Sequence, residues 1–352
     1  MSFKRICVIS ACVGAALAAI CAAVLCARWY QDNRRGNFSR SAELFVYPGE
    51  DASAVLDTID SRAGVRSRRS LERAFEDKRV SEFMQPGHYT VDESSSSVYV
   101  ARMLNNGWQT PVSLTLSGNL RLKGNIAAKI SSQLLLDSAS VRRAMDDEDF
   151  LARYGFSPVD VFNLIIPATY EIYWTAGVED VFDRFKQAYD AFWTEENLRK
   201  AEEVGLDRRE VGILASIVTA ESNAEAEMPL IAGVYLNRLA IGMPLQADPT
   251  VAYCFDYSLS RILNVHLQVD SPYNTYRHAG LPPGPICVPV RAALEAVLNP
   301  DYGGPRGRGN LYFCANADFS GTHVFARTLS EHNRNAARFR AELDRRSRAA
   351  RR

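Results

Sequence analysis

The chain contains the stretch Val211-Gly-Ile-Leu-Ala-Ser-Ile-Val-Thr-Ala-Glu221-Ser-Asn223, in which apolar residues recur every three or four positions. Val211, Leu214 and Val218 therefore share one face of a predicted helix, and Glu221 extends that apolar stripe. Desolvation on the buried side of a helix raises the pKa of a carboxyl group and keeps its proton near neutral pH. A general acid acting on an ether-type leaving group needs such a proton. A second interpretation stays open, because most glutamates are exposed: the stripe ends at Val218, and Glu221 is solvated.

Length and composition are those of a globular protein. The 352 residues are 47% hydrophobic and 23% charged, which allows two or more cores. The 41 basic and 41 acidic residues cancel, so no net charge favours nucleic acid as a partner. A basic tail over 338–352 is expected to be a solvated helix end, and contact with anionic lipid is the alternative.

The N-terminus predicts a membrane anchor. An uncharged run from Ile6 to Ala27 follows Lys4 and Arg5, and as a helix its 22 residues would span about 33 Å, enough to cross a hydrocarbon core. The expected order is a cytoplasmic stub over 1–5 and a transmembrane signal anchor over 6–27. A cleaved signal peptide is the alternative, because Ala16-Leu-Ala18 resembles a processing site.

Charge around the anchor favours a cytoplasmic N-terminus, which would place the body of the chain on the periplasmic side of the inner membrane. Lys4 and Arg5 support this orientation. Arg28, Arg34 and Arg35 lie just beyond the other end and weaken the bias.

Cysteine and histidine spacing gives no sign of a metal site. The sequence has no CxxC pair and no HExxH spacing, so we expect neither a metal nor another cofactor. Three cysteines lie outside the anchor, so at most one pair can form, and the sequence leaves their pairing open. They are Cys254, Cys287 and Cys314.

A small module is expected after a polar linker over 28–41. Strand signals at Glu43–Tyr47 and Gly87–Val91 enclose two helical segments, near 54–59 and 70–75. Strand, helix, helix, strand is the order of a LysM module, a fold that grips glycan chains, so we predict a LysM-like module over 42–118. A spacer without a binding role is the alternative.

A connecting segment over 119–200 and a catalytic domain over 201–337 are expected to follow. Helices are predicted over 126–135 and from Val178 to about Glu203, and Tyr312-Phe313 and Val324-Phe325 are predicted to pair as strands. The predicted fold class is α+β, with an N-terminal transmembrane helix, the LysM-like module and a mixed α+β catalytic domain.

Several motifs follow Glu221 in a fixed order. Pro229 begins a helix that contains Asn237 and Arg238. The later motifs are Met243–Val251, Ser271–Tyr276, Gly280–Ile286, Leu311–Asn316, Gly321–Thr328 and Glu331–Asn333. In order and spacing the chain resembles the endolytic murein transglycosylases of the MltG (YceG-like) family, from the anchor to Asn333.

The resemblance implies that Glu221 is the catalytic glutamate. It also implies a glycan cleft lined by Asn237, Gln246, Asp248, Thr250, Tyr273, Asn274, Thr275 and Tyr276. Two positions depart from the family pattern. Thr219 stands where the family often has a second acid, and Ser117-Gly118 stands where it has an acid–glycine pair.

The chemistry of a lytic transglycosylase needs one acid. Cleavage between N-acetylmuramic acid and N-acetylglucosamine requires protonation of the glycosidic oxygen. If the 6-hydroxyl of muramic acid attacks, the same carboxylate can take its proton, leaving a 1,6-anhydro end. A hydrolase normally needs a second carboxylate. Asp248 is the candidate, although Asp248-Pro249 also has the pattern of a helix N-cap followed by proline, which we prefer.

Other candidate residues have structural alternatives. Tyr273 and Tyr276 could stack on sugars or pack over the proline-rich turn, and Asn274 and Thr275 could bind acetamido groups or stabilise a turn. His323 and His332 are expected to make structural hydrogen bonds. Glu225 and Glu227 are expected to be solvated.

The predicted function is endolytic cleavage of nascent peptidoglycan strands by a membrane-anchored lytic transglycosylase, beside the peptidoglycan synthases. The alternative is a glycan-binding or scaffolding protein without catalytic activity. The expected partners are glycan strands, the membrane and synthases, and no nucleic acid.

Overall fold

The computed structural model describes residues 3–118 and 120–350 and divides into two compact units. The first unit takes in the chain up to Ser113 together with Glu171–Ala176, and the second takes in Leu114–Tyr170 and the chain from Gly177 onward. Three separate two-stranded sheets accompany the described helices. The expected α+β class is therefore confirmed.

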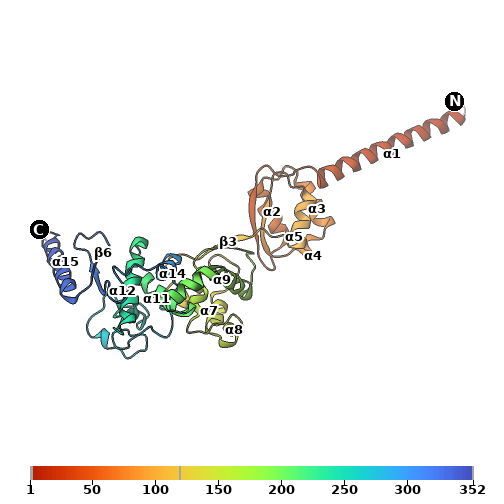
Figure 1. Ribbon diagram of the computed structural model, residues 1–352. Helices are drawn as coiled ribbons and strands as arrows, with labels where there is room; N and C mark the ends of the chain where they lie inside the picture. Colours follow the sequence, from red (N-terminus) through yellow and green to blue (C-terminus); the bar gives the residue numbers. More distant parts are fainter. Residues whose placement is uncertain (1–2, 119, 351–352) are drawn as a thin grey trace. The chain divides into compact units, whose positions relative to one another are not determined.

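The first unit begins with a long helix, α1 (Phe3–Asn33), which Figure 1 draws as a rod extending from the unit. Among the described residues, α1 is the one helix long and apolar enough to cross a membrane. Its exposed side chains include Leu17, Ile20 and Leu25. Such apolar exposure is compatible with the predicted anchor.

The rest of this unit packs helices on one face of a small antiparallel sheet. Strands β1 (Ala42–Val46) and β2 (Gly87–Val91) pair, and the buried face of β1 carries Leu44 and Val46. The alternation of buried and exposed residues along β1 follows from the two-residue repeat of a strand. The accompanying helices are α2 (Ala52–Ala63), α3 (Arg68–Asp77), α4 (Val80–Phe83) and α5 (Ser97–Asn106).

The opposite face of that sheet is covered by a segment from much later in the chain. The ring of Trp174 meets Phe45 edge-on at 5.1 Å and Tyr47 at 4.9 Å, and Phe45 stacks on His88 at 4.6 Å. The predicted order of strand, helix, helix and strand is found, with α4 added between α3 and β2.

The segment 28–41 is built into the first unit and is not a free linker. Helix α1 continues to Asn33, and Phe38 is fully buried in the core. The guanidinium of Arg73 forms an ion pair with Asp32 at 2.7 Å, and the hydroxyl of Ser70 donates to the same carboxylate. The polar composition of the segment suggested a solvated linker. In the structure, polar side chains such as Asp32 instead form contacts with the first unit.

Two strands carry the chain between the units: β3 (Val112–Thr115) and β4 (Thr169–Ile172), which pair with each other. Four elements lie between these strands in the sequence: α6 (Lys123–Ser131), α7 (Ser138–Asp146), α8 (Glu148–Ala152) and the 3-10 turn η1 (Val161–Leu164). Helix α9 (Val178–Phe192) follows β4.

One long helix predicted up to Glu203 is in fact two. Helix α9 ends at Phe192, and α10 (Glu195–Val204) begins after Thr194. The hydroxyl of Thr194 accepts a hydrogen bond from the amide of Asn197 at 3.2 Å. This N-cap starts a new helix where the apolar pattern alone suggested continuity.

The core of the second unit is formed by three helices: α11 (Arg208–Glu221), α12 (Met228–Ala240) and α14 (Arg291–Leu298). Gly233 lets α12 pass close to the chain at Asp301, because an added Cβ would lie 2.0 Å from that carbonyl oxygen. The remaining elements are η2 (Glu225–Glu227), α13 (Asp248–Tyr253), η3 (His266–Gln268), β5 (Tyr312–Ala315), β6 (His323–Ala326) and α15 (Leu329–Ala350).

The C-terminal strands and the basic tail agree with the sequence pattern. Strands β5 and β6 pair antiparallel, with Phe313 opposite Phe325, which confirms the predicted hairpin. The described part of the tail belongs to α15, and most of its described side chains are exposed.

Candidate active site

Helix α11 carries Glu221 at its C-terminal end. Its N-terminus is fixed by a capping box in which Asp207 accepts from the amide of Glu210 at 2.8 Å and Glu210 accepts from that of Asp207 at 2.9 Å. All residues from Val211 to Val218 are buried, so the predicted apolar face is confirmed and the middle of the helix is buried on every side. Burial of the helix brings the carboxyl group of Glu221 into the protein.

The carboxyl group of Glu221 is partly buried and hydrogen-bonded to α12. The hydroxyl of Tyr235 donates to Oε1 of Glu221 at 2.6 Å. Burial raises the pKa of Glu221 to about 7; the Tyr235 hydrogen bond opposes this rise, the charge of Asp248 adds to it, and Arg238 opposes it. The alternative of a fully solvated Glu221 is therefore wrong, and a proton is available on this group near neutral pH.

Glu221 opens onto a cavity of about 320 Å³ in the second unit. Its polar walls come from the end of α11, from α12, and from the loop before α13. Its lining residues are Glu221, Tyr235, Arg238, Leu245, Gln246, Asp248, Tyr276, Tyr312, Phe313, Leu329 and His332.

Arg238 places a buried positive charge at this cavity. It is only 7% exposed, and its guanidinium donates to the carbonyl oxygens of Leu311 at 2.7 Å and Leu245 at 2.5 Å. The same group lies over the ring of Tyr312, 5.4 Å from the ring centre. Among the described residues, no carboxylate lies within ion-pair distance of it, so its charge acts on the cavity.

The ring of His332 stacks on the ring of Tyr312, with ring centres 5.4 Å apart. Burial, and then the charge of Arg238, lowers the pKa of His332. Its Nδ1 atom is buried and has no hydrogen-bond partner within the described part of the chain. The expected structural hydrogen bond of His332 is therefore not found.

Three residues predicted for the glycan cleft line the cavity with Glu221: Gln246, Asp248 and Tyr276. The hydroxyl of Tyr276 donates to Oδ1 of Asp248 at 2.5 Å. Gln246 has a φ of 51°, a left-handed conformation that is uncommon for a residue other than glycine and recurs at functional sites.

Asp248 is not a helix N-cap. Ala247 occupies the cap position of α13, and the carboxylate of Asp248 makes no capping hydrogen bond. The side chain instead accepts the Tyr276 hydroxyl and faces the cavity. The expectation of a cap fails because the chain enters the helix one residue earlier than the Asp-Pro pattern suggests.

Asn237 lies outside the cavity and is fully buried. Its amide donates to the carbonyl oxygens of Tyr302 at 3.1 Å and Asn310 at 2.9 Å, and its own oxygen accepts from the amide of Gly307 at 2.6 Å. All these contacts hold the 302–310 loop against α12.

The remaining predicted cleft residues also lie outside this cavity. Thr250 and Thr275 are buried, with their hydroxyl oxygens 2.9 Å apart, and Asn274 donates to the carbonyl oxygens of Leu267 and Val269. These three hold the loop that carries Tyr276. The hydroxyl of Tyr273 would lie 3.0 Å from an added Cβ at Gly284, so this ring packs on the proline-rich turn.

The structure changes one further expectation and answers one question that the sequence left open. Glu225 is exposed, as expected, but the side chain of Glu227 is only 12% exposed. It accepts from the amide of His323 at 2.7 Å and pairs with the His323 ring at 3.1 Å, which binds β6 to η2. Cys254, Cys287 and Cys314 are free thiols.

Four polar or aromatic residues of the cavity had no site role in the prediction from sequence: Tyr235, Arg238, Tyr312 and His332. A phenol and a guanidinium inside an otherwise apolar helix were the available signal for the first two, because buried polar groups need partners.

A second cavity, of about 770 Å³, lies beside the last turn of α11. Thr219, Ser222 and Asn223 line it, together with Ser117 and Gly118. Both departures from the family pattern, Thr219 and Ser117-Gly118, therefore border one cavity next to the end of α11.

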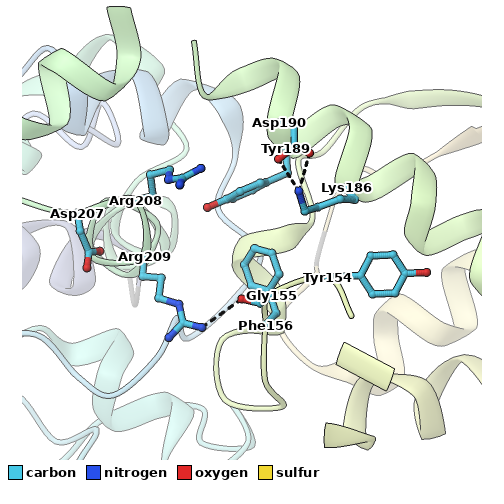
Figure 2. A pocket seen from close by; sticks show the side chains of 9 residues that line it. All are labelled: Tyr154, Gly155, Phe156, Lys186, Tyr189, Asp190, Asp207, Arg208 and Arg209. Carbon is cyan, nitrogen blue, oxygen red and sulfur yellow. Dashed lines mark hydrogen bonds and ion pairs between the residues drawn. The ribbon is translucent and has the colours of Figure 1, made fainter. Parts of the chain in front are cut away.

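A third cavity, of about 410 Å³, lies at the opposite end of α11 (Figure 2). Its basic side chains are largely engaged: Arg209 contacts the carbonyl oxygen of Gly155 at 3.3 Å and Asp160 at 2.8 Å, and Lys186 pairs with Asp190 at 2.5 Å. This cavity has no convergent acid and base comparable to the Glu221 site.

The chain is similar to known proteins over most of its length. A model described as the YceG-like family matches residues 44–338. The endolytic murein transglycosylase of Bacillus subtilis (strain 168) is 29% identical over 313 residues, 84% of this chain and 83% of that relative. The endolytic murein transglycosylase of Streptococcus pneumoniae (strain D39) is 30% identical over 215 residues, 58% of this chain but 36% of that relative.

A solved structure also matches. The crystal structure of a putative YceG-like protein from Listeria monocytogenes has a TM-score of 0.54 and 26% sequence identity, covering 84% of this chain and 99% of the other.

Proposed function

The chain belongs to the YceG-like family, and from this premise we propose that it is an endolytic murein transglycosylase. The substrate is the peptidoglycan glycan strand, the bond is the β-1,4 link from N-acetylmuramic acid to N-acetylglucosamine, and the product carries a 1,6-anhydro end. One observation carries the proposal: Glu221 has a pKa raised to about 7 and opens onto a cavity.

Glu221 is the general acid of the first step. Its Oε1 already accepts the Tyr235 hydroxyl, so Oε2 is the oxygen that carries the acid proton. Transfer of this proton to the glycosidic oxygen releases N-acetylglucosamine with a 4-hydroxyl group, as the bond to the anomeric carbon of N-acetylmuramic acid breaks.

The same carboxylate is the general base of the second step. The 6-hydroxyl of the muramic acid residue attacks its own anomeric carbon, and its proton returns to Glu221. No water is consumed and the acid is regenerated. The Tyr235 hydrogen bond and the charge of Arg238 both lower the pKa of Glu221, so they stabilise the anionic form between the two steps.

Asp248 is proposed to act by charge rather than as a second base. Its carboxylate lines the cavity and is held by Tyr276 at 2.5 Å. A negative charge there stabilises positive charge developing at the anomeric carbon. Gln246 and Tyr276 are the proposed substrate contacts beside it.

Location follows from the anchor. We propose that α1 spans the inner membrane with its N-terminus in the cytoplasm, so that the second unit acts in the periplasm on nascent strands beside the synthases. The first unit, proposed to be LysM-like, would grip the glycan. Cleavage there limits strand length.

The proposal is tested with the full chain in detergent, incubated with purified peptidoglycan. The wild type should release fragments with 1,6-anhydro ends, each lighter by one water than the matching hydrolysis product in mass spectra. Glu221→Gln should release none, whereas Glu202→Gln, an exposed glutamate on α10, should match the wild type.

Two other results of this assay would favour a different function. Release of nothing by the folded wild type, with glycan still bound, would favour a glycan-binding or scaffolding protein. Fragments with ordinary reducing ends would favour a hydrolase in which Asp248 is the second carboxylate.

A further inference from the structure

A small cavity at the foot of α1 is lined by two arginines that have no acidic partner. It measures about 120 Å³ and lies within the first unit. Its lining residues are Gln31, Arg35, Gly36, Asn37, Arg66 and Ser67. A space of this size suits a small ion or headgroup, and it is much smaller than the cavity at Glu221.

Within the described part of this unit, some arginines pair with carboxylates, and these two do not. Arg68 pairs with Asp57, Asp60 and Glu72, and Arg73 pairs with Asp32. In contrast, among the described residues, no carboxylate lies within 4.0 Å of the guanidinium of Arg35 or Arg66. Two uncompensated positive charges therefore face one cavity.

The walls of the cavity are held in place. Asn37 is 4% exposed, donates to the carbonyl oxygen of Ser67 at 3.0 Å and to the hydroxyl of Ser97 at 2.9 Å, and accepts from the amide of Ser67 at 2.8 Å. The guanidinium of Arg66 donates to the carbonyl oxygen of Gly36 at 3.2 Å. These contacts fix Asn37, Ser67 and Arg66 in the wall of the cavity.

The position of the cavity along α1 corresponds to the headgroup layer of a bilayer. The predicted apolar run ends at Ala27, and Gln31 follows about 6 Å further along the helix. The headgroup region extends roughly 5–8 Å beyond the hydrocarbon on each side. Trp29 and Tyr30, both more than half exposed, lie between these two points, where interfacial aromatic residues gather.

We propose that this cavity binds the phosphate group of an anionic membrane lipid. Arginine pairs with phosphate through two parallel hydrogen bonds, and the hydroxyl of Ser67 and the amide of Gln31 supply further donors. The ion pair between Arg73 and Asp32 fixes the cavity to the end of α1, so the headgroup is bound where the helix leaves the membrane. The inference rests on the proposed membrane-spanning role of α1 and not on the transglycosylase chemistry.

The test uses the full chain in micelles that contain equal amounts of phosphatidylglycerol and phosphatidylcholine, with retained lipids counted by native mass spectrometry. The wild type should retain phosphatidylglycerol in preference. Arg35→Gln with Arg66→Gln should weaken that preference by about five-fold for each charge removed. Arg102→Gln, an exposed arginine of α5 that does not line the cavity, is the matched control and should behave as the wild type.

Three results separate the explanations. An unchanged preference in the double glutamine variant overturns the proposal. Displacement of the lipid by inorganic phosphate, at an ionic strength where chloride has no effect, overturns the assignment to a lipid and indicates free phosphate. Recovery of the preference in Arg35→Lys with Arg66→Lys supports a charge-based site and excludes a purely structural role for the two guanidinium groups.

Membrane insertion is checked independently, by flotation of each variant with liposomes. Failure of the wild type to float would refute the spanning role of α1, while leaving the Glu221 chemistry untouched.

Discussion

The hydroxyl of Tyr235 donates a 2.6 Å hydrogen bond to Oε1 of Glu221, and this contact joins the C-terminal end of α11 to the middle of α12. It gives the two carboxyl oxygens different roles, because one is occupied and the other faces the cavity. The following predictions depend on that asymmetry and on the charges around it.

Activity should depend on a protonated Glu221. Its pKa is raised from 4.5 to about 7, so the acid form is present below about pH 7 and is lost as pH rises through that value. We expect the rate of anhydro-end formation to fall about ten-fold per pH unit above this point. A rate that stays flat to pH 9 in the same assay would contradict the assignment of Glu221 as the acid.

Tyr235→Phe should move the fall in rate at alkaline pH to a higher pH. The Tyr235 hydrogen bond lowers the pKa of Glu221, so its removal raises that pKa. The maximal rate should also fall, by about ten-fold or more, because the carboxyl group loses its orientation. Tyr273→Phe, which alters a phenol outside the cavity, should leave the pH profile in place.

Asp248→Asn should move the fall in rate at alkaline pH to a lower pH. The charge of Asp248 raises the pKa of Glu221, and its loss lowers it. Products from the variant should still carry anhydro ends, formed more slowly. A shift in the same direction as that of Tyr235→Phe would refute this electrostatic account.

Asn237→Ala should destabilise the second unit without removing a substrate contact. Three backbone groups would lose their hydrogen-bond partner inside the protein, at a cost of about 3 kcal/mol. We expect the Tm to fall by roughly 10 °C in thermal unfolding, with KM for glycan unchanged at a temperature where the variant is folded. A raised KM with an unchanged Tm would instead indicate that Asn237 contacts the glycan substrate. Asn223→Ala, at an exposed site, is the control for stability.

Asp32→Asn should loosen the attachment of α1. The Asp32 side chain is 14% exposed and holds Arg73 through both carboxylate oxygens, so its loss should cost about 2 kcal/mol locally. Hydrogen exchange of the amides over 30–41 should become faster. Asp57→Asn breaks an exposed ion pair and should change exchange little.

The sequence predicted helix α11 and its buried face well, because the signal is local. The spacing of Val211, Leu214 and Val218 reflects burial of α11, and Glu221 follows in phase. Tyr235 was missed because it lies 14 positions away on another helix, and only the packing of α11 against α12 brings the phenol to the carboxyl group.

Residues proposed to bind substrate and residues that bind the backbone have similar sequence signatures. Asn237, Asn274 and Thr275 are polar residues within motifs, and so are Gln246 and Tyr276. Burial separates the two groups, since the first three are at most 2% exposed. The sequence could not supply that distinction, because it depends on where the loops fold back.

Burial in the segment 28–41, expected to be a linker, was likewise not predicted from the sequence. Its polar composition suggested a flexible chain, but Phe38 in its middle is fully buried and Asp32 is paired. An aromatic residue in a polar stretch was the available warning, because a lone apolar side chain of that size seldom stays in water.

The packing of Trp174 on Phe45 and Tyr47 bears on how this architecture can be recombined. The residues that complete the first unit are encoded after those that begin the second, so a single crossover cannot exchange the first unit intact. A chimaera made by splicing near Ser113 would bring a foreign sheet to the native tryptophan. Successful swaps therefore need to carry the 171–176 segment with its own sheet.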